Sequence, residues 1–162
     1  MSVSASRLRP ASLALRVLGI AWTLPNTVVG LVAGAVGLAF GARASLRGED
    51  LAIAFDQFPT PFARQGALVL GNVILHTGAS LDGDCETYAH RAGLACEPRV
   101  RLCDHERAHV LQYMALGPLF LPLYFLCGGI SVRNRFERAA DRYAQSGCGW
   151  WPWAAGPDRP GR

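Results

Sequence analysis

The chain has 162 residues, enough for one compact domain, or for a membrane anchor with one small domain attached, but not for a second globular unit. Hydrophobic residues make up 51% of the chain and charged residues only 17%, so the positions of the few charges are informative. All sixteen basic residues are arginine, and no arginine cluster is interleaved with aromatic residues, which argues against nucleic-acid binding.

The first part of the chain predicts a membrane anchor. Residues 1–16 contain three arginines and no acid, and residues 17–42 contain no charge at all. These 26 uncharged residues exceed the roughly 20 that cross a bilayer as a helix. We therefore expect a basic N-terminal lead over 1–16, a transmembrane helix over 17–42, and contact with membrane lipid. A cleaved signal peptide is the alternative, but the run is long for one and Pro25 interrupts it.

Glycines recur through the same apolar run, at Gly30, Gly34, Gly37 and Gly41. Small residues spaced four apart allow helices to approach closely in lipid, so this helix offers a possible route to an oligomer. The alternative is that glycine is simply common here, with eighteen in the chain.

Residues 43–148 predict one small α+β domain. Two runs that favour strands, Leu51 to Phe55 and Ala67 to Leu75, are bounded by glycine and proline and indicate a small antiparallel sheet. A loop-rich segment follows, with a short helix expected from Cys85 to Ala92. The five cysteines form no C-x-x-C pair, so they give little support to a cysteine zinc site.

The segment "DHERAHVLQ", residues 104 to 112, contains the pattern His-Glu-x-x-His. In a helix that begins at Asp104 as N-cap, His105 and His109 lie on one face, about 6 Å apart along the axis. Two neutral imidazoles at this spacing bind Zn²⁺, and Glu106 is placed to act as general base on the water that the metal activates. We therefore expect His105 and His109 to be zinc ligands and Glu106 to be catalytic.

A third ligand is expected from a second helix, Asn134 to Gln145. Glu137 follows His109 by 28 residues, and Asp141 lies one helical turn further on the same face. A catalytic zinc site has three protein ligands and one open position, which Glu137 would complete, while Asp141 would accept the outer N–H of a zinc-bound histidine. The alternative for Glu137 is a capping box with Asn134, which needs no metal.

His-Glu-x-x-His followed by Glu-x-x-x-Asp resembles the gluzincin metallopeptidases, and the resemblance covers these two helices. It implies a zinc-dependent hydrolase, with a peptide or protein as substrate. The wider string "HERAHVLQYMALGPLFLPLYF" with "NRFERAAD", together with "LPNTVVGL" and "LGNVIL", resembles a group of small bacterial membrane proteins that has no established activity. That resemblance implies a bacterial inner membrane and leaves the substrate open.

The path of the uncharged residues 110–132 decides whether this site can form. As one straight helix they would extend about 35 Å and hold His109 and Glu137 on opposite sides of a membrane. Gly117, Pro118, Pro122 and the pair Gly128-Gly129 instead predict a re-entrant apolar segment that doubles back. The helical C-terminal half would then bind zinc.

The charge pattern supports a different topology, because basic ends around an acidic middle fit a protein with two membrane spans and both termini in the cytoplasm. In that case the chain would be a non-enzymatic scaffold or partner subunit. An inactive zinc-binding pseudoenzyme is a further alternative. Gln112 is expected to bond either a ligand or, more simply, the loop at Gly117, and residues 149–162 are expected to form a disordered tail.

Overall fold

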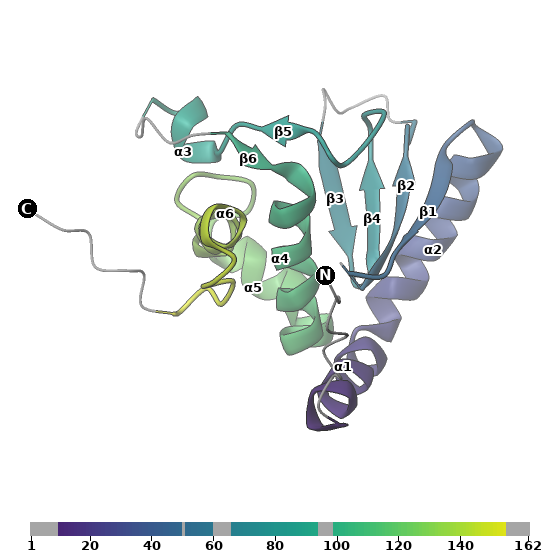
Figure 1. The fold of residues 1–162 in the computed structure, drawn as a ribbon, viewed down its shortest axis with the longest axis horizontal. Coiled ribbons are helices and arrows are strands. Elements are labelled where there is room, and N and C mark those ends of the chain that lie inside the picture. The colour runs from purple at the N-terminus through teal and green to yellow at the C-terminus, as the bar shows by residue number, and fades with distance from the viewer. Residues whose placement is uncertain (1–9, 50, 60–65, 94–98, 155–162) are drawn as a thin grey trace, which may run out of the picture.

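The computed structural model describes residues 10–49, 51–59, 66–93 and 99–154. They form a mixed α+β fold in which a four-stranded sheet lies between helices (Figure 1). The helices are α1 (Pro10–Trp22), α2 (Leu24–Ala39), α3 (Tyr88–Arg91), α4 (Leu102–Leu116), the 3₁₀ turn η1 (Gly117–Leu119), α5 (Phe120–Leu126) and α6 (Arg135–Ser146). The strands are β1 (Arg43–Arg47), β2 (Ala52–Asp56), β3 (Ala67–Leu70), β4 (Val73–His76), β5 (Asp84–Cys85) and β6 (Val100–Arg101).

The main sheet has the strand order β1-β2-β4-β3, and β5 and β6 form a separate antiparallel pair. A small sheet is present as predicted, and β1 pairs antiparallel with β2, as does β3 with β4. The two predicted runs themselves, however, pair in parallel, through β2 and β4. The predicted strand Ala67 to Leu75 is in fact a hairpin, because Gly71 adopts a positive φ of 63° and reverses the chain. Strand β1 was not predicted. Its residues are exposed at the sheet edge, so they lack the apolar alternation that marks a strand.

Two hydrophobic layers cover the two faces of this sheet. Ile74 packs in one cluster with Val110 and Tyr113 of α4, while Val73 and its neighbours on the opposite face pack against α2. Successive strand residues point to opposite faces, so β4 contributes to both layers and is buried throughout. Helix α4 is therefore held against the sheet along one side.

The apolar run 17–42 forms two helices rather than the one transmembrane helix predicted. Helices α1 and α2 meet at an angle of 67° at Thr23, and α1 begins at Pro10, before the predicted boundary. Pro25 cannot donate to the carbonyl four residues earlier, which favours a break at this point. The Thr23 hydroxyl donates to the side chain of Asn72 at 2.9 Å and so ties the elbow to the sheet. Of the predicted N-terminal lead over 1–16, residues 1–9 lie outside the described residues, and the rest belongs to α1.

The glycines of α2 face the chain's own sheet. Gly30, Gly34 and Gly37 are buried, and a Cβ at Gly34 would lie 2.3 Å from the ring of Phe55. Their small size thus allows α2 to approach the sheet closely. In this fold that glycine face is not available for the predicted oligomer contact.

The C-terminal half doubles back as predicted. Helix α4 ends at Gly117, where φ is +55°, and the chain continues through η1 and α5 to Gly128 and Gly129, which also have positive φ. Helix α6 then packs against α4, crossing it (Figure 1). By length and composition alone, two segments could cross a membrane: the stretch Leu102–Leu126, and the bent pair α1 and α2 taken as one broken span.

Several predicted ends are shifted. Helix α4 begins at Leu102 with Arg101 as N-cap, so Asp104 lies in its first turn and is not the cap. The predicted helix Cys85 to Ala92 shortens to α3, because Thr87 caps it and Cys85 pairs in β5. Of the predicted tail 149–162, the part up to residue 154 is ordered against α6, with the ring centroids of Trp153 and Phe136 5.6 Å apart. Residues 155–162 lie outside the described part.

Candidate metal centre

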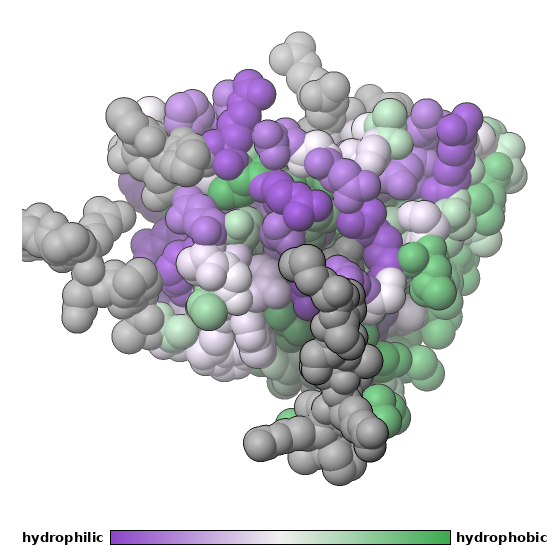
Figure 2. Space-filling view, viewed as in Figure 1, coloured by the Kyte–Doolittle hydropathy of each residue, from purple (hydrophilic) through white to green (hydrophobic). Residues whose placement is uncertain are grey.

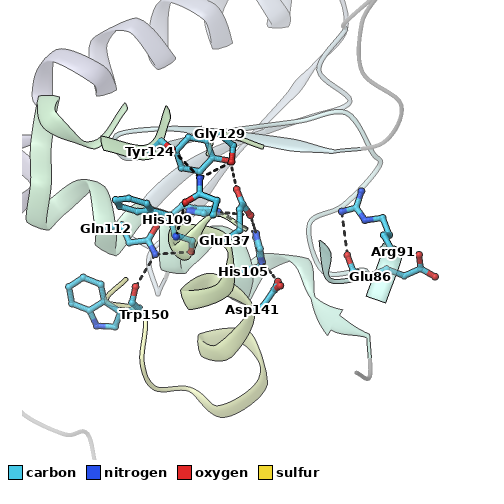
Figure 3. Close-up of polar contacts among 12 residues, drawn as sticks. Glu86, Arg91, His105, His109, Gln112, Tyr124, Gly129, Glu137, Asp141 and Trp150 are labelled. Atoms are coloured by element: carbon cyan, nitrogen blue, oxygen red, sulfur yellow. Dashed lines mark hydrogen bonds and ion pairs between the residues drawn. The ribbon is translucent and has the colours of Figure 1, made fainter. Parts of the chain in front are cut away.

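Three predicted ligands converge between α4 and α6. The Glu137 Oε2 atom lies 3.2 Å from His105 Nε2 and 3.6 Å from His109 Nε2, and the two imidazole nitrogens are 3.2 Å apart (Figure 3). Ligand atoms about 2.1 Å from a tetrahedral cation lie about 3.4 Å from one another. The three distances therefore match the spacing that a zinc ion requires. Within the described residues, no other group of three His, Cys, Asp or Glu side chains converges in this way.

All three side chains are buried, with 7%, 7% and 4% of the surface of His105, His109 and Glu137 exposed. Burial alone would raise the pKa of Glu137, but the two imidazoles outweigh it and hold the pKa well below its usual range. Burial would likewise lower the pKa of His105, yet the carboxylates of Asp141 and Glu137 raise it to about 10. Glu137 also raises the pKa of His109 against the effect of burial. The buried carboxylates thus favour the positively charged forms of His105 and His109.

The outer nitrogen of each histidine is held by a separate residue. Asp141 Oδ1 lies 2.9 Å from His105 Nδ1, as the sequence predicted, and Gln112 Oε1 lies 2.9 Å from His109 Nδ1. An acceptor at Nδ1 keeps the proton there and leaves the Nε2 lone pair for a metal. Both Nε2 atoms point toward Glu137, so the tautomers suit a bound cation.

The orientation of Gln112 is itself fixed. Its amide nitrogen donates to the carbonyls of Phe136 at 3.2 Å and Trp150 at 2.8 Å, which turns its oxygen toward His109 (Figure 3). The favoured expectation, a bond to the loop at Gly117, is therefore wrong. Trp150 comes from the segment expected to be disordered, so no pattern in the chain connected it with the site.

Glu137 does not form the alternative capping box. Asn134 caps α6 by accepting a hydrogen bond from the backbone N–H of Phe136 at 2.9 Å. The Glu137 carboxylate instead receives a hydrogen bond on Oε1 from the Tyr124 hydroxyl, while Oε2 is buried and faces the Nε2 atoms of His105 and His109 at 3.2 and 3.6 Å. A buried carboxylate oxygen that faces two imidazole nitrogens suits a metal ligand better than a helix cap.

Glu106 lies beside the ligands and lines a cavity of about 130 Å³. Burial raises the pKa of its carboxyl, although His105 and His109 oppose the shift. A carboxyl with a raised pKa is suited to accept and return a proton near neutral pH. Glu106, the residue expected to act as general base, thus has a carboxyl whose pKa is shifted toward neutral pH.

Two tyrosines also reach the cavity. Tyr124 comes from α5 and Tyr88 from the start of α3, and both line the cavity. Burial raises the pKa of Tyr88 to about 12, and the nearby charge of Glu137 adds to the shift, so its hydroxyl remains a donor. The sequence offered no ranking among its four tyrosines, because only the fold brings these two to the site.

Comparisons with models of protein families, with curated proteins and with solved structures give no match.

Proposed function

We propose that this protein is a membrane-anchored, zinc-dependent hydrolase of the metallopeptidase type, with His105, His109 and Glu137 as the zinc ligands. One observation supports this above the others: three ligand atoms converge beside an acidic group in a cavity. When bound, Zn²⁺ would supply a Lewis acid that acidifies water and polarises a carbonyl oxygen.

The remaining residues have separate tasks. Glu106 accepts a proton from water and passes it to the leaving nitrogen, which requires a carboxyl that changes charge easily. Asp141 and Gln112 keep the histidines in the required tautomers. Tyr88 offers its hydroxyl to oxygen that becomes negative as the amide is attacked.

The wall of the cavity supports an extended peptide as substrate. Ala67, Leu68 and Val69 of β3 line the cavity, and β3 is the last strand of the sheet. Among the described residues only β4 pairs with it. An edge strand offers backbone donors and acceptors to an added chain, so the small cavity needs to hold only the residues next to the cleaved bond.

The first experiment is metal analysis of the purified protein. We expect close to one zinc per chain in the wild type and a large loss in His109→Ala. Asp104→Asn is the matched control, because Asp104 lies on the same helix but outside the cluster. Equal zinc in the wild type and His109→Ala would refute the site.

A structural zinc site is the second candidate, and the deep burial of all three ligands supports it. In that case zinc would be present but no amide would be cleaved. Hydrolysis of a fluorogenic peptide library by the zinc-loaded protein separates the two, provided that Glu106→Gln keeps zinc and abolishes any cleavage seen. The two-span scaffold makes neither prediction, since it requires no metal.

A further inference from the structure

Helix α2 buries its small residues and exposes its large apolar ones, the opposite of the usual pattern in a water-soluble fold. Its buried face is made of glycines, while Val28, Val32 and Val36 are exposed on its outer side. Helix α1 likewise exposes large apolar residues, and the apolar surface extends along both helices at the lower right of the molecule (Figure 2). In water this arrangement forgoes the burial of the largest side chains, which is the main driving force of folding. The outer surface of α1 and α2 therefore requires an apolar partner.

A lipid bilayer fits this surface. The uncharged run is bordered by Arg16 and Arg43, and arginines at the border of an apolar surface pair with anionic lipid headgroups. The inner face of α2 supports the sheet, whose edge strand β1 is exposed and polar. An open polar edge does not enter hydrocarbon, so α2 lies along one leaflet with the sheet on the water side. Its 16 residues, about 24 Å, also fall short of the roughly 30 Å hydrocarbon core.

The mouth of the metal cavity is apolar, and α5 and η1 join it to helices α1 and α2. Three cavity-lining residues are strongly exposed: Leu68, Phe125 and Ile130, at 52%, 65% and 74%. Phe125 belongs to α5, which follows directly from η1, and η1 contacts both α1 and α2. Leu119 of η1 and Leu126 of α5 are also strongly exposed, so the elements that join the elbow of α1 and α2 to the cavity present large apolar side chains as well.

Because the cavity mouth, η1 and helices α1 and α2 all expose large apolar side chains and contact one another in sequence, we propose that the cavity opens onto the bilayer, and that the substrate is a membrane-anchored polypeptide whose apolar part stays in the lipid while its amide reaches the cluster. This inference rests on the proposed hydrolase function. The reaction needs only water, which gives its hydroxyl to the acyl carbon and its proton to the leaving nitrogen as the C–N bond breaks. Entry from the bilayer explains why bulky apolar residues surround the opening of a charged site.

The orientation is tested by photocrosslinking the full-length protein in mixed vesicles of phosphatidylcholine and phosphatidylglycerol. Benzoyl-phenylalanine replaces Val32, Ile130 or, as control, Leu46, which is 82% exposed on β1. We expect lipid adducts at positions 32 and 130 and none at 46. Adducts at 32 without adducts at 130 would overturn the proposed opening, and absence of adducts at 32 would overturn the bilayer surface itself.

The substrate class is tested with two probes, a soluble fluorogenic peptide and the same peptide carrying a palmitoyl chain in the vesicles. In Ile130→Ser, cleavage of the palmitoylated peptide should fall about tenfold relative to the soluble one, because one apolar side chain that would insert into the lipid at the cavity mouth is lost. Leu46→Ser should leave this ratio unchanged. An unchanged ratio in Ile130→Ser would contradict entry from the bilayer.

The two proposals fail in different ways. Lipid adducts do not depend on zinc, so they should persist in His109→Ala. Lipid adducts at position 130 in a protein that binds no zinc would refute the hydrolase function and the substrate class, but would support the membrane orientation. Zinc-dependent cleavage without lipid adducts at position 130 would refute the opening of the cavity onto the bilayer, but not the hydrolase function.

Discussion

Replacing Asp141 by asparagine tests how far the zinc affinity depends on the residue behind the ligand. Asp141 is buried, with Oδ1 2.9 Å from His105 Nδ1, and it contributes to the raised pKa of that imidazole. Asparagine keeps the shape and an acceptor oxygen but removes the charge, so the imidazole becomes a weaker donor to the metal. Loss of such a supporting group weakens zinc binding by about 10- to 100-fold, or about 1.4 to 2.8 kcal/mol. We expect the lower end of that range for Asp141→Asn and the upper end for Asp141→Ala.

The affinity is measured at pH 7 by competition with a chromophoric zinc chelator. Asp104→Asn is the matched control, since it makes the same chemical change one residue from His105 at a partly exposed side chain. A dissociation constant that is unchanged in Asp141→Asn, or changed equally in Asp104→Asn, would refute the supporting role of Asp141.

Glu106→Gln should keep stoichiometric zinc but lower peptide cleavage by about 10²- to 10⁴-fold, as measured by metal analysis and steady-state kinetics. The pKa of His105 is about 10 without metal, so zinc binding at pH 7 should release at least one proton, and zinc affinity should rise as the pH rises toward 10. Calorimetry in buffers of different ionisation heat measures the number of protons released. Binding without proton release would contradict the protonated state of His105. Gly34→Ala should lower the free energy of unfolding by about 1 to 3 kcal/mol in thermal or chemical denaturation, because its Cβ would meet the ring of Phe55. Gly48→Ala is its control, since a Cβ there meets nothing within 4 Å.

The part of the site that could be predicted depends on local spacing. His105 and His109 share a helical face whatever the rest of the chain does, and so do Glu137 and Asp141. Their meeting required the apolar segment to return, which the glycines at its two ends indicated and the fold confirms. The contact of Gln112 with His109, three positions away, follows from the shared helical face. The contacts of Gln112 with Phe136 and of Tyr124 with Glu137 span 24 and 13 positions, and no local pattern reports them.

The errors in the fold have the same origin. The hairpin of β3 and β4 looks like one apolar run, since both strands are buried and a two-residue turn leaves little trace in the pattern. Strand β1 has the opposite difficulty, because an exposed edge strand has no buried face to report. The break between α1 and α2 was visible in Pro25, but its angle depends on the contact of Thr23 with Asn72, 49 residues away.

The charge balance of the cluster supports the proposal that it binds a cation. Three carboxylates, Glu106, Glu137 and Asp141, and two imidazoles are all buried, and a buried cluster of charges stabilises a fold less than apolar residues of the same volume. Without metal, protons on the two histidines offset the carboxylates, as the raised pKa values of both imidazoles indicate. A divalent cation with neutral imidazoles supplies the same charge as two protons. Zinc would therefore replace those protons without changing the net charge of the interior, and Glu137 Oε2, which faces both imidazoles, would become its ligand.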